Sequence, residues 1–105
     1  MKREHFAHFH IAGFSYYEGV LAFKNLKVGK QVTLKHESKN IKDKYAVEIY
    51  HEENKLGYIP KGENRQIAKL LITGNDCFEA RVQWINLDSY PEGQIGIIVY
   101  LLSKE

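Results

Sequence analysis

Apolar and polar residues alternate along several stretches of the chain, which is the pattern of β-strands with one buried face. In residues 5–13, Ala7, Phe9 and Ile11 fall on one face, and His8 and His10 fall on the other. Further strand-like segments follow at residues 31–36, 46–51, 55–60, 77–85 and 95–102. The sequence therefore predicts six short strands.

The period of the pattern changes to that of a helix in residues 62–74. Ile67, Leu70 and Leu71 lie along one helical stripe there, and Gly74 is placed to cap the C-terminal end. A second short helix is predicted over residues 19–26, which read GVLAFKNL.

These elements predict a mainly β fold, a small closed or nearly closed barrel of six strands with one or two short helices. The chain of 105 residues is too short for two full packed sheets, and we expect one domain over residues 1–105. Closure also removes the exposed edges that a flat sheet would leave. A ferredoxin-like sandwich is less favoured, because it needs two full crossover helices.

Composition places the chain among soluble globular proteins, with 44% apolar and 27% charged residues. The first ten residues carry the charges of a signal peptide without its apolar segment, and no run of 18 apolar residues exists. We therefore expect a cytoplasmic protein with no membrane partner. The single cysteine, Cys77, allows no intramolecular disulfide and no CxxC zinc motif, in agreement with a reducing compartment.

Charge is distributed unevenly along the chain. The segment 24–44 has seven lysines and two acidic residues, a local net charge of +5, whereas the whole chain carries +2 and the remainder therefore −3. Aromatic residues lie within or beside this segment: Tyr16, Tyr17, Phe23, Tyr45, Tyr50 and Tyr58. Single-stranded nucleic acid binders combine cations for phosphates with flat rings for bases. Core packing is the competing interpretation for each ring taken alone.

Two adjacent tyrosines, Tyr16 and Tyr17, stand in the segment GFSYYEG. On an extended chain neighbouring side chains project to opposite faces, so at most one of these rings can enter a core. We expect the other ring to face water or a ligand.

Signatures of common enzymes are absent from the sequence, which has no GxSxG, no GxxxxGK[ST] and no HExxH. We therefore expect no catalysis and no cofactor. His8 and His10 share a strand face, whereas alternation places His5 on the opposite face. Because a closed metal site needs four ligands, an exposed polar face is the favoured interpretation, and no metal is expected.

Three segments in order, HIAGFSYYEG, LKVGKQVTLKHESKNIKDKYAVEIY and KLGYIPKGENRQIAKLLITG, resemble the HIRAN domain. They cover residues 10–74, about two thirds of the chain. An aromatic pair, an N-x-x-D sequence followed by Ala-Val, and G-Y-I-P form a fairly specific set. HIRAN domains are similar to OB-type barrels, so the resemblance implies an OB-like barrel.

In fork-remodelling translocases, HIRAN domains capture the 3′ end of single-stranded DNA. The resemblance implies that Tyr16 and Tyr17 contact the terminal nucleotides. It also implies that Asn40 and Asp43 recognise the end, with Asp43 accepting a hydrogen bond from the 3′ hydroxyl. A carboxylate suits that role, because it only accepts hydrogen bonds and repels a phosphate.

Further contacts follow from the same resemblance. Lys61 falls where the family has a phosphate-contacting lysine, and Trp84 lies roughly where it has another stacking ring. Alternation, however, places Trp84 on the core face, so only a strand end or a bulge would expose it. Two positions depart from the family pattern: its usual arginine is Ser15 here, and the tyrosine before the aspartate is Lys42. The second change exchanges a stacking ring for a point charge in the binding site.

The sequence as a whole predicts a non-catalytic module that binds single-stranded DNA at a 3′-hydroxyl end. Any reaction then belongs to a partner such as a helicase or nuclease acting in trans. Two alternatives stay open: a protein-interaction adaptor that uses the surface of Tyr16 and Tyr17, and a metal-assisted enzyme that uses His8 and His10.

Overall fold

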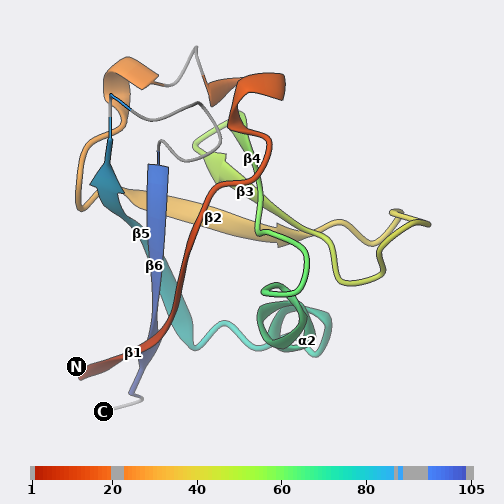
Figure 1. Ribbon diagram of the computed structural model, residues 1–105. Helices are drawn as coiled ribbons and strands as arrows, with labels where there is room; N and C mark the ends of the chain where they lie inside the picture. The colour runs from red at the N-terminus through yellow and green to blue at the C-terminus, as the bar shows by residue number, and fades with distance from the viewer. Residues whose placement is uncertain (1, 20–22, 87, 89–94, 104–105) are drawn as a thin grey trace.

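A computed structural model describes residues 2–19, 23–86, 88 and 95–103 (Figure 1). The strands are β1 (Arg3–His10), β2 (Gln31–His36), β3 (Val47–His51), β4 (Asn54–Tyr58), β5 (Phe78–Ile85) and β6 (Ile95–Leu102). The helical elements are the 3-10 turns η1 (Phe14–Tyr16) and η2 (Phe23–Asn25) and the helix α2 (Arg65–Ile72). All six predicted strands are thus present, with ends that differ from the predictions by a few residues at most.

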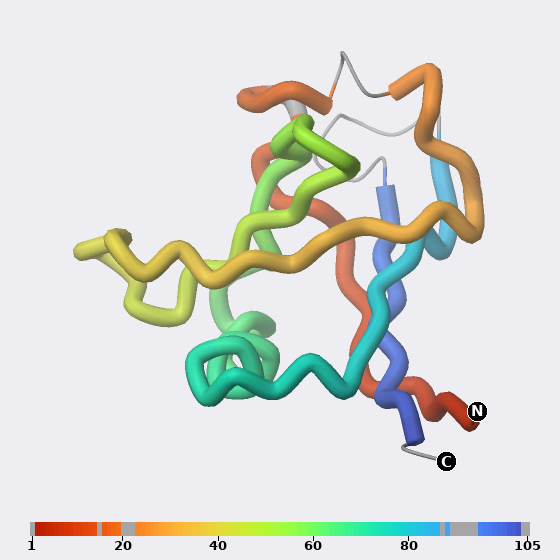
Figure 2. Tube along the Cα trace, turned by 180° about the vertical axis from the view of Figure 1, so that it is seen from behind, coloured from red at the N-terminus to blue at the C-terminus, as the bar shows by residue number. Residues whose placement is uncertain are grey.

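The strands form an antiparallel sheet in the order β1-β6-β5-β2-β3-β4. Its two edges meet just beyond β1, where Ala12 and Tyr58 exchange backbone hydrogen bonds of 2.8 and 2.9 Å. This exchange closes the sheet, so the predicted small barrel is confirmed. The turns η1 and η2 lie at one end of the barrel and α2 at the other (Figures 1 and 2).

The core consists of the inward-facing apolar side chains of the strands, together with one face of α2. Val47, Ile49, Leu56, Ile97 and Val99 have no exposed surface. Ile67 and Ala68 of α2 are buried against this cluster, and Leu71 packs beside them. The expected stripe on α2 is therefore largely confirmed.

The end of α2 also agrees with the sequence. The N–H of Gly74 donates to the carbonyl of Leu71, and the N–H of Asn75 donates to that of Leu70, which is a Schellman motif. The other predicted helix, over residues 19–26, lies partly outside the described residues, and its described part contains η2, a 3-10 turn. Among the described residues, no helix is long and apolar enough to cross a membrane.

A β-bulge in β1 changes the expected arrangement of the histidines. The register shifts between His5 and Ala7, and this shift reverses the alternation for the residues before it. His5 therefore lies beside His8, with Nε2 of His5 2.9 Å from Nδ1 of His8, and not on the opposite face as predicted. Within the described ranges, no group of three or more potential metal ligands is present.

Candidate nucleic-acid interface

The two adjacent tyrosines lie in and directly after the turn η1, and neither ring enters the core. Tyr16 is 79% exposed and Tyr17 is 39% exposed, whereas Phe14 of the same turn is buried. The prediction assumed an extended chain, in which alternation sends neighbouring rings to opposite faces. Tyr16 lies inside η1 and Tyr17 leaves the turn with φ −124° and ψ −150°, so the alternation of an extended chain does not hold here, and both rings face outward while Phe14 is buried.

Tyr17 is held against β4, while Tyr16 is mostly exposed. The Tyr17 ring meets the Tyr58 ring edge-on at 5.6 Å, and Nζ of Lys55 lies 4.4 Å from the Tyr17 ring centre. The backbone N–H of Glu18 donates to the carbonyl of Lys55 at 2.8 Å, which fixes this segment to β4. The tyrosine pair therefore offers one anchored ring and one exposed ring.

Asn40 and Asp43 lie in the loop between β2 and β3, which projects from the barrel on the side of α2 (Figure 2). The Asn40 side-chain oxygen accepts hydrogen bonds from the backbone N–H groups of Lys42 and Asp43, each at 2.9 Å. Asn side chains commonly form such turns with the backbone that follows. Asn40 thus shapes the loop that carries Asp43.

Both carboxylate oxygens of Asp43 accept hydrogen bonds. The N–H of Tyr45 donates to Oδ1 at 2.9 Å, and the Asn64 amide donates to Oδ2 at 3.0 Å. The Tyr45 N–H, followed by Asn64 and the charge of Lys61, lowers the pKa of the Asp43 carboxyl, although burial acts in the opposite direction. Asp43 is therefore ionised at neutral pH. A carboxylate has about four acceptor positions, so it can still accept from a ligand hydroxyl.

A chain of hydrogen bonds joins the tyrosine side of the site to Asn40. The Lys55 ammonium donates to the Tyr58 hydroxyl at 2.8 Å, and that hydroxyl donates to Glu37 at 2.9 Å. Glu37 also accepts from the Asn40 amide at 2.8 Å. Burial opposes the charge on Lys55, but its bonds to Tyr58 and Glu48 outweigh this effect and raise the pKa of its ammonium. Each donor in this chain meets an acceptor, and a fully satisfied network of this kind is rigid.

Five of the seven predicted site residues border one open hollow of about 330 Å³, here called the end hollow. It is lined by Ala12, Tyr17, Asn40, Lys42, Asp43, Ala46, Tyr58, Ile59, Lys61 and Asn64. Segments distant in sequence thus meet around one space that offers a ring, a carboxylate, amides and two cations. Of the described residues, the predicted site members outside this lining are Tyr16 and Trp84.

Trp84 lies at a second bulge. The register of β5 against β6 shifts between Val82 and Trp84, and the ring is 39% exposed. Its indole lies directly against Gly96, where any side chain would overlap it. The sequence predicted that only a strand end or a bulge would expose Trp84, and a bulge is present. Trp84 is not among the residues that line the end hollow.

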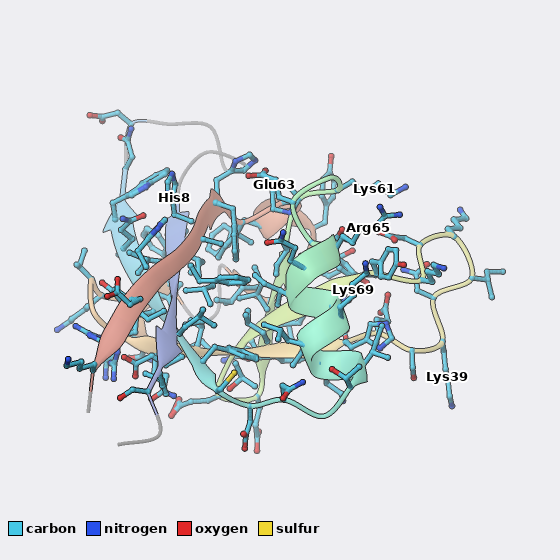
Figure 3. All side chains as sticks on the ribbon, turned by 90° about the horizontal axis from the view of Figure 1, so that it is seen from below. His8, Lys39, Lys61, Glu63, Arg65 and Lys69 are labelled. Carbon is cyan, nitrogen blue, oxygen red and sulfur yellow. The ribbon has the colours of Figure 1, made fainter. Side chains whose placement is uncertain are left out.

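A second hollow of about 340 Å³ adjoins the end hollow and shares Asp43, Lys61 and Asn64 with it. Its remaining lining residues include Tyr45 and Arg65, whose guanidinium lies 5.1 Å from the Tyr45 ring centre. Figure 3 shows Lys61, Arg65 and Lys69 on the side of the molecule where Lys39 projects, with His8 on the opposite side. Several basic side chains therefore lie on this side.

Sequence reasoning missed several residues that build the site. Asn64 is 5% exposed, and its side-chain amide bonds to Asp43 and makes no capping hydrogen bond to α2, which it directly precedes. Glu37 and Lys55 connect the network, and no local pattern marks either one. Tyr58 belongs to the G-Y-I-P segment, so the sequence pointed to its position but not to its hydrogen bonds.

Comparison with known proteins gives a consistent family. The family model described as the HIRAN domain matches residues 5–101. A crystal structure of a protein from Lactobacillus plantarum is similar, with a TM-score of 0.78, 22% identity and 95% of each chain covered. The HIRAN domain of human HLTF is also similar, with a TM-score of 0.73, 19% identity, and 94% of this chain and 78% of that chain covered. No curated protein matches the chain.

Proposed function

Because the chain belongs to the HIRAN domain family, a family of DNA-binding domains, we propose that it binds single-stranded DNA at a 3′-hydroxyl end. The observation that carries this proposal is the end hollow, where Tyr17, Asn40 and Asp43 meet beside two lysines. A ring for stacking, an acceptor for a hydroxyl and cations for phosphates are the groups that a strand end requires.

Each residue has a role in this proposal that follows from its geometry. Asp43 accepts the hydrogen bond of the terminal hydroxyl, and Asn40 holds the loop in the shape that presents Asp43. The anchored ring of Tyr17 stacks on a terminal base, and Tyr16 offers a second ring at the rim. Lys42 and Lys61 neutralise phosphates beside the end.

The proposed module binds without catalysing a reaction. Processing of the bound end would fall to a separate helicase or nuclease acting in trans. The histidines of β1 have no part in the proposed binding.

Salt dependence tests the proposal most directly. For single strands, log K falls with log salt by about 0.7 for each phosphate neutralised. Lys61→Gln is expected to lessen the slope by about 0.7, because it removes one such contact. Lys35→Gln, a change of equal charge on the exposed side of β2, is the matched control and should leave the slope unchanged. A slope near zero in the native protein would contradict nucleic acid binding and favour a peptide ligand.

The tyrosine pair provides a second test. Tyr16→Ala is expected to leave the free energy of unfolding nearly unchanged, because its ring is exposed, and to weaken DNA binding by about 1 to 3 kcal/mol if it stacks on a base. Tyr17→Ala should weaken binding and also lower stability, because its ring contacts Tyr58 and Lys55. Urea denaturation and fluorescence anisotropy measure the two quantities. Unchanged binding in both variants would remove the tyrosines from the interface.

A further inference from the structure

A separate hollow of about 380 Å³ lies beside the β3–β4 turn, and the proposed function does not use it. Its lining residues are Lys24, Asn25, Lys27, Lys30, His51 and Glu52, and we call it the lysine hollow. Three cations and one carboxylate give this lining a net positive charge. Among the described residues, none of the three lysines forms an ion pair. Their charges are therefore available to a ligand.

His51 adds an unmet hydrogen-bonding group to this lining. The residue is only 6% exposed, and its Nδ1 has no hydrogen-bond partner among the described residues. The nearest carboxylate oxygen, Oε1 of Glu52, is 4.0 Å away, too far for a hydrogen bond. A buried polar atom without a partner is unfavourable. A ligand in the hollow would relieve this cost.

We propose that the lysine hollow is a phosphate-binding site, in which Lys24, Lys27 and Lys30 supply charge and His51 a directional hydrogen bond. Lysine ammonium groups bind phosphate as point charges. A phosphate has enough acceptor oxygens to meet several donors at once, as this lining requires. Glu52 is the one lining group that opposes an anion, so its neutralisation should strengthen binding.

The ligand of this site is either free inorganic phosphate or a backbone phosphate of a bound nucleic acid strand. Ala46 borders the end hollow and His51 the lysine hollow. Ala46 directly precedes β3 and His51 is its last residue, so these two lining residues are about 17 Å apart at a strand rise of about 3.3 Å per residue. A stacked nucleic acid strand rises about 3.4 Å per nucleotide, so it would reach the lysine hollow after about five nucleotides.

The tyrosine segment runs along β4 from the end hollow and provides a route for such a strand. Ala12 pairs with Tyr58, and Glu18 bonds to Lys55, so residues 13–17 follow β4 from the end hollow toward the β3–β4 turn. A strand along this route would cross the exposed rings before it reached the lysines. This part of the inference rests on the proposed function, whereas the phosphate site itself does not.

Titration with inorganic phosphate at constant ionic strength tests the site without any DNA. We expect a saturable shift of the His51 ring signals in nuclear magnetic resonance spectra of the native protein. Lys27→Gln/Lys30→Gln should weaken this binding at least tenfold, and Glu52→Gln should tighten it. The matched control, Lys2→Gln/Lys35→Gln, removes the same charge elsewhere and should leave the binding unchanged. Unmoved His51 signals, or equal losses in both double variants, would overturn the proposal.

A comparison of 3′-hydroxyl strands of 4 and 12 nucleotides then identifies the source. If the strand backbone supplies the phosphate, the longer strand binds more tightly to the native protein, and Lys27→Gln/Lys30→Gln removes that advantage while leaving the 4-nucleotide affinity intact. Saturable phosphate binding without a length advantage supports the site with free phosphate as its ligand. Failure of the 4-nucleotide strand to bind would count against the proposed function alone.

Discussion

Gly57→Ala is expected to destabilise the protein by about 2 to 6 kcal/mol, a large part of the stability of a small domain. Gly57 has a φ of 151°, which residues other than glycine rarely adopt. An added Cβ would overlap the carbonyl oxygen of Ala12 and lie 2.7 Å from Cγ2 of Ile11. That carbonyl accepts the Tyr58 N–H that closes the barrel, and backbone cannot move aside as a flexible side chain can. The substitution therefore disrupts the closure itself.

Gly62→Ala is the control that measures the loss of stability from backbone strain alone, without an overlap such as that of Gly57 with Ala12. Gly62 has a φ of 89°, but an added Cβ there meets no atom within 4 Å. We expect it to cost about 1 to 2 kcal/mol, the usual penalty of a left-handed conformation. Urea denaturation followed by fluorescence of Trp84, the single tryptophan, measures both variants. Equal losses at the two positions would show that the approach of Ala12 is unimportant.

The same closure supports the proposed binding site. Ala12 and Tyr58 line the end hollow, so the bond that joins the sheet edges also forms part of its wall. Gly57→Ala should consequently weaken DNA binding, even in the fraction of molecules that remains folded. The Gly62 control should bind normally, although Gly62 borders the adjoining hollow.

The strands and α2 could be predicted because each buries one face, and burial on one face leaves a regular period in the sequence. Gly74 could be predicted as a cap for a similarly local reason. The prediction that at most one of Tyr16 and Tyr17 enters the core holds, but the extended chain assumed for it was wrong, because nothing local showed that a 3-10 turn lies there. The predicted position of His5 was also wrong, because a bulge shifts the alternation of side chains between the two faces and leaves no pattern of its own in the sequence.

The candidate site was predictable only in part. The family motifs pointed to Asn40, Asp43 and Lys61, and the structure brings these residues together around one hollow. Asn64 could not be found in this way, because its bond to Asp43 joins residues that are 21 positions apart. Contacts of this kind depend on how the loop between β2 and β3 meets the start of α2, which no periodicity describes.

The native protein is expected to prefer strands that end in a 3′ hydroxyl over strands that end in a 3′ phosphate, by about 5- to 150-fold. The range corresponds to about 1 to 3 kcal/mol, the cost of leaving a buried hydrogen-bonding group without a partner. A hydroxyl can donate to Asp43, whereas a terminal phosphate cannot and brings like charge to a half-buried carboxylate. Lys42 and Lys61 attract that phosphate, but both side chains are exposed, so solvent weakens this attraction more than the repulsion from the half-buried Asp43.

Asp43→Asn should abolish this preference, because the amide keeps the shape of the carboxylate but loses its charge. The substitution also alters the bond to Asn64, so a drop in stability alone would be ambiguous. Asn64→Ala removes the same bond while the carboxylate stays, and it should therefore lower the melting temperature but retain the preference. Anisotropy titrations of the two labelled ends at about 0.15 M salt, near physiological ionic strength, compare the three proteins. Equal affinity of the native protein for both ends would refute end recognition by Asp43 and leave it as a residue that stabilises the loop before β3.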